Sequence, residues 1–269
     1  MATTLNSTGV LFPGDTQRTT ARHIRYRDKA IFGFGQNSAG TALSVTNLVN
    51  NTGLVSNDIT GVGTARSAVA AASYGGDKAI FGYGRISGSS YAFLTNLVSN
   101  LGVVSGNVAG VGTSRISFAA TGYGGDKAIF GYGINASTYY SLTNLISNIG
   151  VVSGDVAGVG TARSGLAAAG YGGDRAIFGY GATGFYYSMT NLVSNLGVVG
   201  TDVTGVGTIR NQLAAAVYGG DKAIFGYGIT WSGSVLNITN LVSNTGVVAT
   251  DTAGVGSARS SPGAAGYGS

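Results

Sequence analysis

The chain has 269 residues, of which 44% are hydrophobic and only 9% are charged. It is long enough to bury a sizeable core and too apolar to be a disordered tail. Cysteine is absent, which excludes disulfides, thiolate metal sites and a cysteine nucleophile. Glycine accounts for 48 residues and proline for only two. Because glycine usually makes up roughly 7% of a protein, this composition favours short strands joined by tight turns.

The first 27 residues form a predicted basic N-terminal arm, with four arginines and one aspartate. They show no signal peptide pattern, and no apolar run in the chain approaches the roughly 18 residues of a membrane span. The only histidine, His23, lies here without an acidic partner nearby in sequence. The rest of the chain is nearly neutral, so we expect neither a specific nucleic-acid partner nor membrane insertion.

From residue 28 onward the chain repeats itself five times. The stretch YGGDKAIFGYG at residues 74–84 recurs with few changes in each unit. Its aspartate stands at Asp28, Asp77, Asp126, Asp174 and Asp221, and in each unit it is followed by a Thr-Asn-Leu and then a Gly-Val-Gly motif. The period is therefore 47–49 residues, and it fills nearly the whole chain after the arm.

Each unit contains four segments of strand length. In the second unit they are residues 67–74, 78–83, 94–99 and 103–109, bounded by glycine, asparagine and aspartate. No segment shows a sustained helical period, so we expect little helix.

Four antiparallel strands in a unit of this length predict one blade of a β-propeller. Residues 28–269 are therefore expected to form an all-β, five-bladed propeller, with the alanine-rich first segments at its crowded centre. The chain ends just after a fifth such segment, which would complete the blade begun at Asp28 and close the ring. Two alternatives stay open: a six-bladed ring with an incomplete blade shared by residues 2–15 and 260–268, and a β-solenoid.

The order Arg-Ser, alanine-rich strand, glycine pair and Phe-Gly-Tyr-Gly resembles the kelch repeat in all five units. The later tyrosine and tryptophan of the kelch pattern are not kept in place. The faithful repetition also resembles propeller proteins of bacteriophages and aquatic viruses, and propeller lectins. These resemblances imply a propeller, and a location on a virion or outside the cell.

The repeats contain no constellation typical of an enzyme. Glutamate is absent, and the aspartates occupy equivalent positions, whereas a glycosidase needs two unlike carboxylates at one site. The Gly-x-Gly pieces lead into loops and strands, so they do not predict a phosphate-binding helix. We expect no cofactor and no metal. The repeated Asp-Lys pair is interpreted as a turn, the alternative being a ring of carboxylates that binds a cation or sugar hydroxyls.

Strand parity places the Gly-Gly-Asp turns on one face, and the variable loops and repeated arginines on the other. Aromatic side chains beside hydroxyl and amide groups suit sugars or a protein surface. The candidate ligand-binding residues are Arg66, Arg115, Arg163, Arg210, Arg259, Arg85, Tyr91, Tyr139, Tyr140, Phe185, Tyr186, Tyr187 and Trp231. In the alternative interpretation, the repeated arginines only tie neighbouring blades together, and the loop aromatics only pack outer strands.

Three functions follow as hypotheses. The first is a non-enzymatic, multivalent, lectin-like module that binds cell-surface glycans or a host surface receptor, as part of a viral tail or fibre. The second is a structural propeller docked to other structural proteins of a larger assembly, such as a virion, through residues 1–27. The third, an enzyme acting on polysaccharides, has the least support.

Overall fold

The computed structural model describes residues 5–6, 9–10, 29–88 and 90–266, and these ranges contain strands but no helix. Accordingly, they offer no helix that could cross a membrane. Of the predicted N-terminal arm, only the short strands β1 (Leu5–Asn6) and β2 (Gly9–Val10) are described, and they pair antiparallel. The expected scarcity of helix is confirmed for the described residues.

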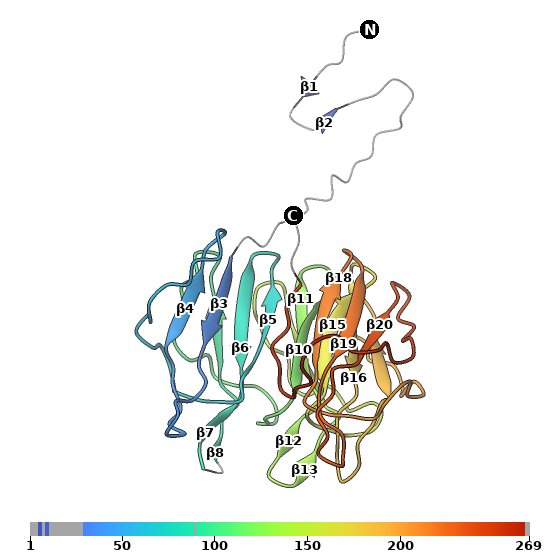
Figure 1. Ribbon diagram of the computed structural model, residues 1–269. Helices are drawn as coiled ribbons and strands as arrows, with labels where there is room; N and C mark the ends of the chain where they lie inside the picture. Colours follow the sequence, from blue (N-terminus) through green and yellow to red (C-terminus); the bar gives the residue numbers. More distant parts are fainter. Residues whose placement is uncertain (1–4, 7–8, 11–28, 89, 267–269) are drawn as a thin grey trace.

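Five antiparallel sheets, one for each repeat, make up the body of the protein (Figure 1). Sheet one contains β3 (Ala30–Gly33) and β4 (Thr46–Val49), and sheet two contains β5 (Ala70–Tyr74), β6 (Lys78–Gly82) and β9 (Thr95–Val98). Sheet three contains β10 (Ala119–Tyr123), β11 (Lys127–Gly131) and β14 (Thr143–Ile146). Sheet four contains β15 (Ala167–Tyr171), β16 (Arg175–Gly179) and β17 (Thr190–Val193). Sheet five contains β18 (Ala214–Tyr218), β19 (Lys222–Gly226) and β20 (Thr239–Val242).

The fourth segment of each repeat does not form the continuous strand that the sequence predicts. It meets the third strand through two isolated bridges, such as Val98 with Val104 and Thr95 with Val108 in sheet two. Asparagine and serine side chains supply further links: the amide of Asn96 donates to the Ser105 carbonyl oxygen at 3.0 Å, and the Leu97 backbone amide donates to Oγ of Ser105 at 2.9 Å. The observed sheets therefore have two or three strands, with the fourth segment attached at their edge.

The Phe-Gly-Tyr-Gly motif stands at the end of the second strand, where in sheets two to four its first glycine leaves room for an aromatic ring of the next sheet. A Cβ atom on Gly131 would lie 2.6 Å from Cζ of Phe178 in the next sheet, so only glycine leaves room for that ring. The following residue, Tyr132, has a φ of 65°, and its ring packs on Phe178 at 5.2 Å between centroids. The motif is thus a contact between neighbouring sheets rather than a ligand-binding loop.

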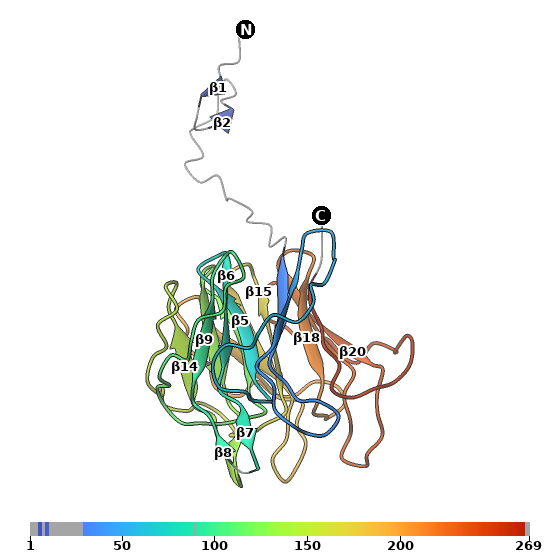
Figure 2. The same ribbon diagram turned by 90° about the vertical axis from the view of Figure 1, so that its left-hand side faces the viewer.

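The first strands β5, β10, β15 and β18 contact one another in this order, which places the sheets around a common centre. In Figures 1 and 2 the hairpin of β7 (Arg85–Ser87) and β8 (Ser90–Tyr91) points away from the face at which β3 begins. The hairpin of β12 (Ile134–Asn135) and β13 (Thr138–Tyr139) points the same way in Figure 1. This all-β arrangement is compatible with a β-propeller.

Candidate functional site

The repeated arginines are enclosed between neighbouring sheets. Arg163 is completely buried and donates three hydrogen bonds: to the carbonyl oxygens of Tyr180 at 2.7 Å and Thr161 at 2.9 Å, and to Oδ1 of Asn191 at 2.7 Å. Its guanidinium carbon lies 4.4 Å from the centre of the Tyr132 ring in the preceding sheet. A planar cation suits this position because it can stack on a ring and donate in its own plane. Arg163 therefore joins sheet three to sheet four.

Three other arginines repeat this arrangement and are also completely buried, namely Arg66, Arg115 and Arg210. Burial lowers the pKa of Arg66 to about 10, which leaves it charged at neutral pH. The structure corrects the expectation that these four arginines face a ligand and supports the alternative in which they tie neighbouring sheets together. Arg259 is exposed, and it keeps the stacking contact, at 3.9 Å from the centre of the Tyr227 ring.

A carboxylate holds the asparagine beside each of the last three buried arginines. Asp202 accepts hydrogen bonds from the hydroxyl of Thr161 at 2.7 Å and from the amide of Asn191 at 2.9 Å. Burial by itself would raise the pKa of Asp202, but these hydrogen bonds and the charge of Arg163 hold it below its ordinary value. Asp155 and Asp251 repeat the arrangement. The repeated fourth-segment aspartates thus serve the contact between sheets.

The Gly-Gly-Asp motif is a turn that also contacts the next sheet. Gly75 and Gly76 have φ values of 61° and 80°, and Asp77 Oδ1 pairs with Lys78 Nζ at 2.8 Å. The backbone amide of Gly75 donates to the Asp126 carbonyl oxygen of the next turn at 2.7 Å. The described residues contain no group of three or more acidic, histidine or cysteine side chains that would suit a metal ion. These contacts support the turn interpretation of the motif.

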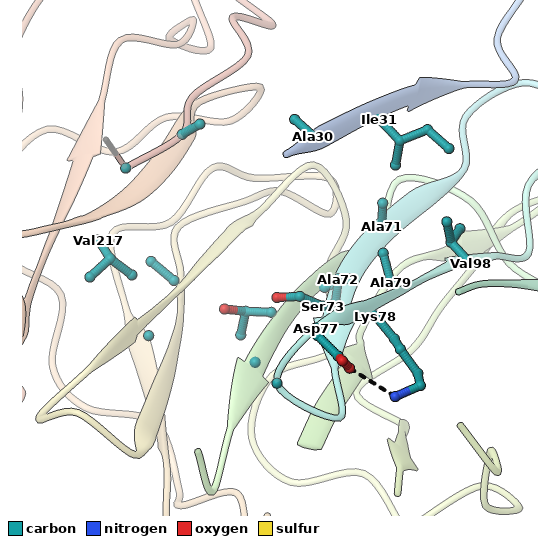
Figure 3. A pocket seen from close by; sticks show the side chains of 18 of the residues that line it. Ala30, Ile31, Ala71, Ala72, Ser73, Asp77, Lys78, Ala79, Val98 and Val217 are labelled. Carbon is teal, nitrogen blue, oxygen red and sulfur yellow. Dashed lines mark hydrogen bonds and ion pairs between the residues drawn. The ribbon is translucent and has the colours of Figure 1, made fainter. Parts of the chain in front are cut away.

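Residues of the five first segments line one cavity of about 800 Å³. Small residues of all five segments line it, such as Ala72, Thr121, Ala169, Val217 and Ala265, which explains why these segments are rich in alanine and glycine. Figure 3 shows this wall, with the Asp77–Lys78 pair at its edge. The charged side chains of this lining, such as Lys127, Asp174 and Arg175, belong to the Gly-Gly-Asp turns at its edge, whereas the first segments contribute mainly small apolar side chains.

The variable loops share one face with the arginine connections, as strand parity predicts. Ser67, which follows Arg66, exchanges two backbone hydrogen bonds of 2.8 Å with Arg85, which opens the second variable loop. The loops themselves differ in structure: those of sheets two and three form hairpins, whereas those of sheets four and five close through single bridges. Arg85, Tyr91, Tyr139 and Tyr140 are half-buried on these loops. Because the loops differ, they do not form five equivalent sites.

The structure brings three of the predicted aromatic residues into one exposed cluster. Phe185 and Trp231, which are 73% and 66% exposed, stack with their ring centres 6.5 Å apart at an interplanar angle of 27°. Tyr186 meets Trp231 edge-on at 5.5 Å. These residues belong to two neighbouring loops, and we call them the aromatic platform. Beside it, the hydroxyls of Tyr187 and Thr183 lie 3.1 Å apart.

Sequence reasoning missed a second feature, on the opposite face. The turns between the third and fourth segments expose one or two aliphatic side chains in every repeat, and we call the strongly exposed ones the aliphatic rim. They are Leu54, Leu101, Val103, Ile149, Val151, Leu196, Val198 and Val247, each 61–78% exposed. A Cβ atom on Gly75 would lie 2.8 Å from the carbonyl oxygen of Asn148, so these turns share a face with the Gly-Gly-Asp turns. The rim could have been recognised from a motif that recurs once per repeat, namely asparagine, then leucine, isoleucine or threonine, then glycine, then valine or leucine.

Comparisons with known proteins add no relative. No protein-family model matches the sequence, and a search of curated proteins finds no significant match. The kelch-like and viral resemblances therefore stay predictions from the sequence pattern.

Proposed function

We propose that the five sheets are the blades of a five-bladed β-propeller whose C-terminal strand completes the first blade. Four first strands are in sequential contact, and residues 264–266 lie next to β18, since a Cβ atom on Gly266 would lie 2.6 Å from the Val217 carbonyl oxygen. These residues and Ala30 of β3 line the same cavity, which favours five blades over six. The ring would hold the variable loops rigidly on one face.

On this frame we propose a non-enzymatic, lectin-like recognition module that binds glycans of a cell surface or host receptor. The observation that carries it is the aromatic platform, where Trp231 and Phe185 present their rings to solvent from two neighbouring loops. Large exposed aromatic side chains are costly in water and are typical of binding sites. The faces of such rings pack well against the apolar faces of sugars.

Hydroxyl groups border the platform, as a sugar site requires. Thr183 and Tyr187 belong to the loop of Phe185, and Thr230, Ser232 and Ser234 form a chain of hydroxyl contacts of 2.9 and 3.3 Å in the loop of Trp231. Ser232 and Ser234 can exchange their partners for sugar hydroxyls at little cost, because they are exposed. Tyr91, Tyr139 and Tyr140 on neighbouring loops would add weaker contacts, so that several loops bind one glycan-bearing surface together. Such a module suits the exposed end of a viral tail or fibre.

A glycan array probed with the wild-type protein tests this proposal. We expect a defined set of glycans to bind, and Trp231→Ala or Phe185→Ala to abolish that binding without lowering the melting temperature. Ile86→Ala, an exposed residue of another loop, is the matched control and should leave binding intact. Failure of the wild-type protein to bind either the array or cells would contradict the proposal.

The aliphatic rim favours a second candidate function, a structural propeller docked into a larger assembly. Eight strongly exposed aliphatic side chains on one face exceed what isolated surface residues explain. Lys29, the first described residue after the N-terminal arm, lines the same cavity edge as Asp77 and Asn100 of the turns on this face, and β3 begins at this face in Figure 1. We therefore propose that the arm and the rim serve the same docking contact. The aromatic face would then point away from the assembly.

Two variants separate the functions. Deleting residues 1–25, or combining Leu101→Ser, Ile149→Ser and Leu196→Ser, should impair incorporation into the assembly while glycan binding persists. If assembly is unchanged in both variants, the docking role is wrong.

A further inference from the structure

Four successive joins between sheets follow one pattern of contacts. At the join of sheets four and five, the Phe225 ring packs on Tyr180 at 5.2 Å and fills the space beside Gly179. On the same join Tyr171 is covered by Gly246 of the next sheet and is only 3% exposed. The equivalents of Phe225 in sheets two to four are likewise buried, with at most 4% exposed. The pattern therefore defines what a completed join looks like.

One face of sheet five, the face turned away from sheet four, lacks these contacts within the described part of the chain. A Cβ atom on Gly226, the equivalent of Gly179, would meet only Thr239 and no aromatic ring. Tyr218 and Leu241 are 38% and 39% exposed, although the equivalent Tyr171 is buried. Sheet five thus offers the groups that another sheet would cover.

On sheet one, the uncovered face is the one that in sheets two to five packs against the preceding sheet. Phe32 is 62% exposed, whereas its equivalents in the other four sheets are buried. Gly246 covers a tyrosine of the preceding sheet, but a Cβ atom on its equivalent, Gly53, would meet no described atom within 4 Å. Sheet one thus offers the ring and the glycine that sheet five lacks.

The polar groups are complementary in the same way. Arg210 donates hydrogen bonds to a backbone carbonyl oxygen and to an asparagine side chain of sheet five. Arg259 stacks on Tyr227 and donates to the Ser257 carbonyl oxygen, but among the described residues it has no bond to a carbonyl or asparagine of another sheet. By position in the repeat, those acceptors are the Phe34 carbonyl oxygen and Oδ1 of Asn47, for which no arginine partner is described. Ser257 likewise corresponds to Thr161 and would donate to Asp58, as Thr161 does to Asp202.

We infer that the outer face of sheet five binds the uncovered face of sheet one in the same chain, through a fifth join of the same pattern. Phe32 would cover Gly226 and Tyr227, and Arg259 would donate to Asn47. One chain is favoured over two because Val217 of sheet five and Ile31 of sheet one line the same cavity, as Figure 3 shows. This join adds side-chain contacts to the proposed ring and is independent of glycan binding.

Thermal unfolding tests the join. Phe32→Ser should lower the melting temperature by several degrees, close to the effect of Phe225→Ser, although the Phe32 side chain is 62% exposed. Ile149→Ser, at an equally exposed position, should change it little. Similarly, Gly226→Ala should be as harmful as Gly179→Ala. If Phe32→Ser behaves like Ile149→Ser, and Gly226→Ala is tolerated, the join does not exist.

Cross-linking identifies the partner. The chain has no cysteine, so the double variant Asp58→Cys/Ser257→Cys carries the only two thiols. A short bis-maleimide should link them within a monomer, as it should in the control Thr161→Cys/Asp202→Cys. Cross-linked dimers that increase with protein concentration would show that the join forms between two copies, and would overturn closure within one chain. Glycan binding measured in parallel shows whether the recognition function fails separately.

Discussion

The guanidinium carbon of Arg210 lies 4.1 Å from the centre of the Tyr180 ring. Arg210, which precedes sheet five in the chain, therefore stacks on an aromatic side chain of sheet four. The same guanidinium donates to Oδ1 of Asn240 at 2.6 Å. Because stacking and hydrogen bonding use different directions of the group, one side chain connects two sheets.

Replacing this arginine should destabilise the whole protein. Arg210→Lys keeps the charge but loses the planar donor set, which leaves buried acceptors unsatisfied. We expect a loss of about 3–5 kcal/mol in the free energy of unfolding, measured by urea denaturation. Arg85→Lys, on a variable loop, should change it by no more than about 0.5 kcal/mol. Equal effects of the two substitutions would refute the connecting role of Arg210.

Acid should weaken the contacts between sheets. The hydrogen bonds that Asp155, Asp202 and Asp251 accept hold the pKa of each carboxyl below its ordinary value, despite the opposing effect of burial. A lowered folded-state pKa contributes stability that is present above about pH 4 and is lost as the pH falls through the folded-state pKa. Denaturant titrations at pH values from neutral to below about pH 4 should show that the free energy of unfolding decreases as the pH is lowered. Asp202→Asn should be less stable near neutral pH and should show a shallower fall.

Alkali should act on the buried tyrosines. Burial raises the pKa of Tyr83, Tyr132 and Tyr180 to about 12. A raised folded-state pKa contributes stability that is complete below about pH 10 and is lost as the pH rises through the folded-state value. Tyrosinate absorbance should therefore show late-ionising groups whose titration coincides with unfolding. As a control, Tyr132→Phe should lower the number of late-ionising tyrosines by one.

Glycine is required at some turns and not at others. A Cβ atom on Gly110 would overlap the backbone carbonyl oxygen of Phe93, whereas a Cβ atom on Gly154 would meet nothing within 4 Å. We expect Gly110→Ala to cost about 1–3 kcal/mol or more, because a backbone group cannot move aside easily. Gly154→Ala should be neutral. Similar melting temperatures for the two variants would show that the turn at Gly110 can open.

Much of the architecture is a local property of the repeat and could be predicted. The expected segments 67–74 and 78–83 correspond to β5 and β6, and strand parity placed Arg85 on the same face as the arginine connections. The expected continuous fourth strand was wrong, because its contact with the third strand is limited to two bridges and to side-chain bonds such as that of Asn96. Alternation of small and apolar residues does not distinguish a strand from an extended segment held in this way.

The sequence by itself determined that one β-structured unit is used five times, because turn residues and strand lengths depend on neighbours along the chain. Only the tertiary structure decided what the repeated side chains do. Arg163 is enclosed because a ring 31 positions before it and an asparagine 28 positions after it converge on one point. Trp231 and Phe185 likewise form a platform only because two loops meet in space. Burial and proximity of this kind depend on how whole sheets stack, which no single repeat encodes.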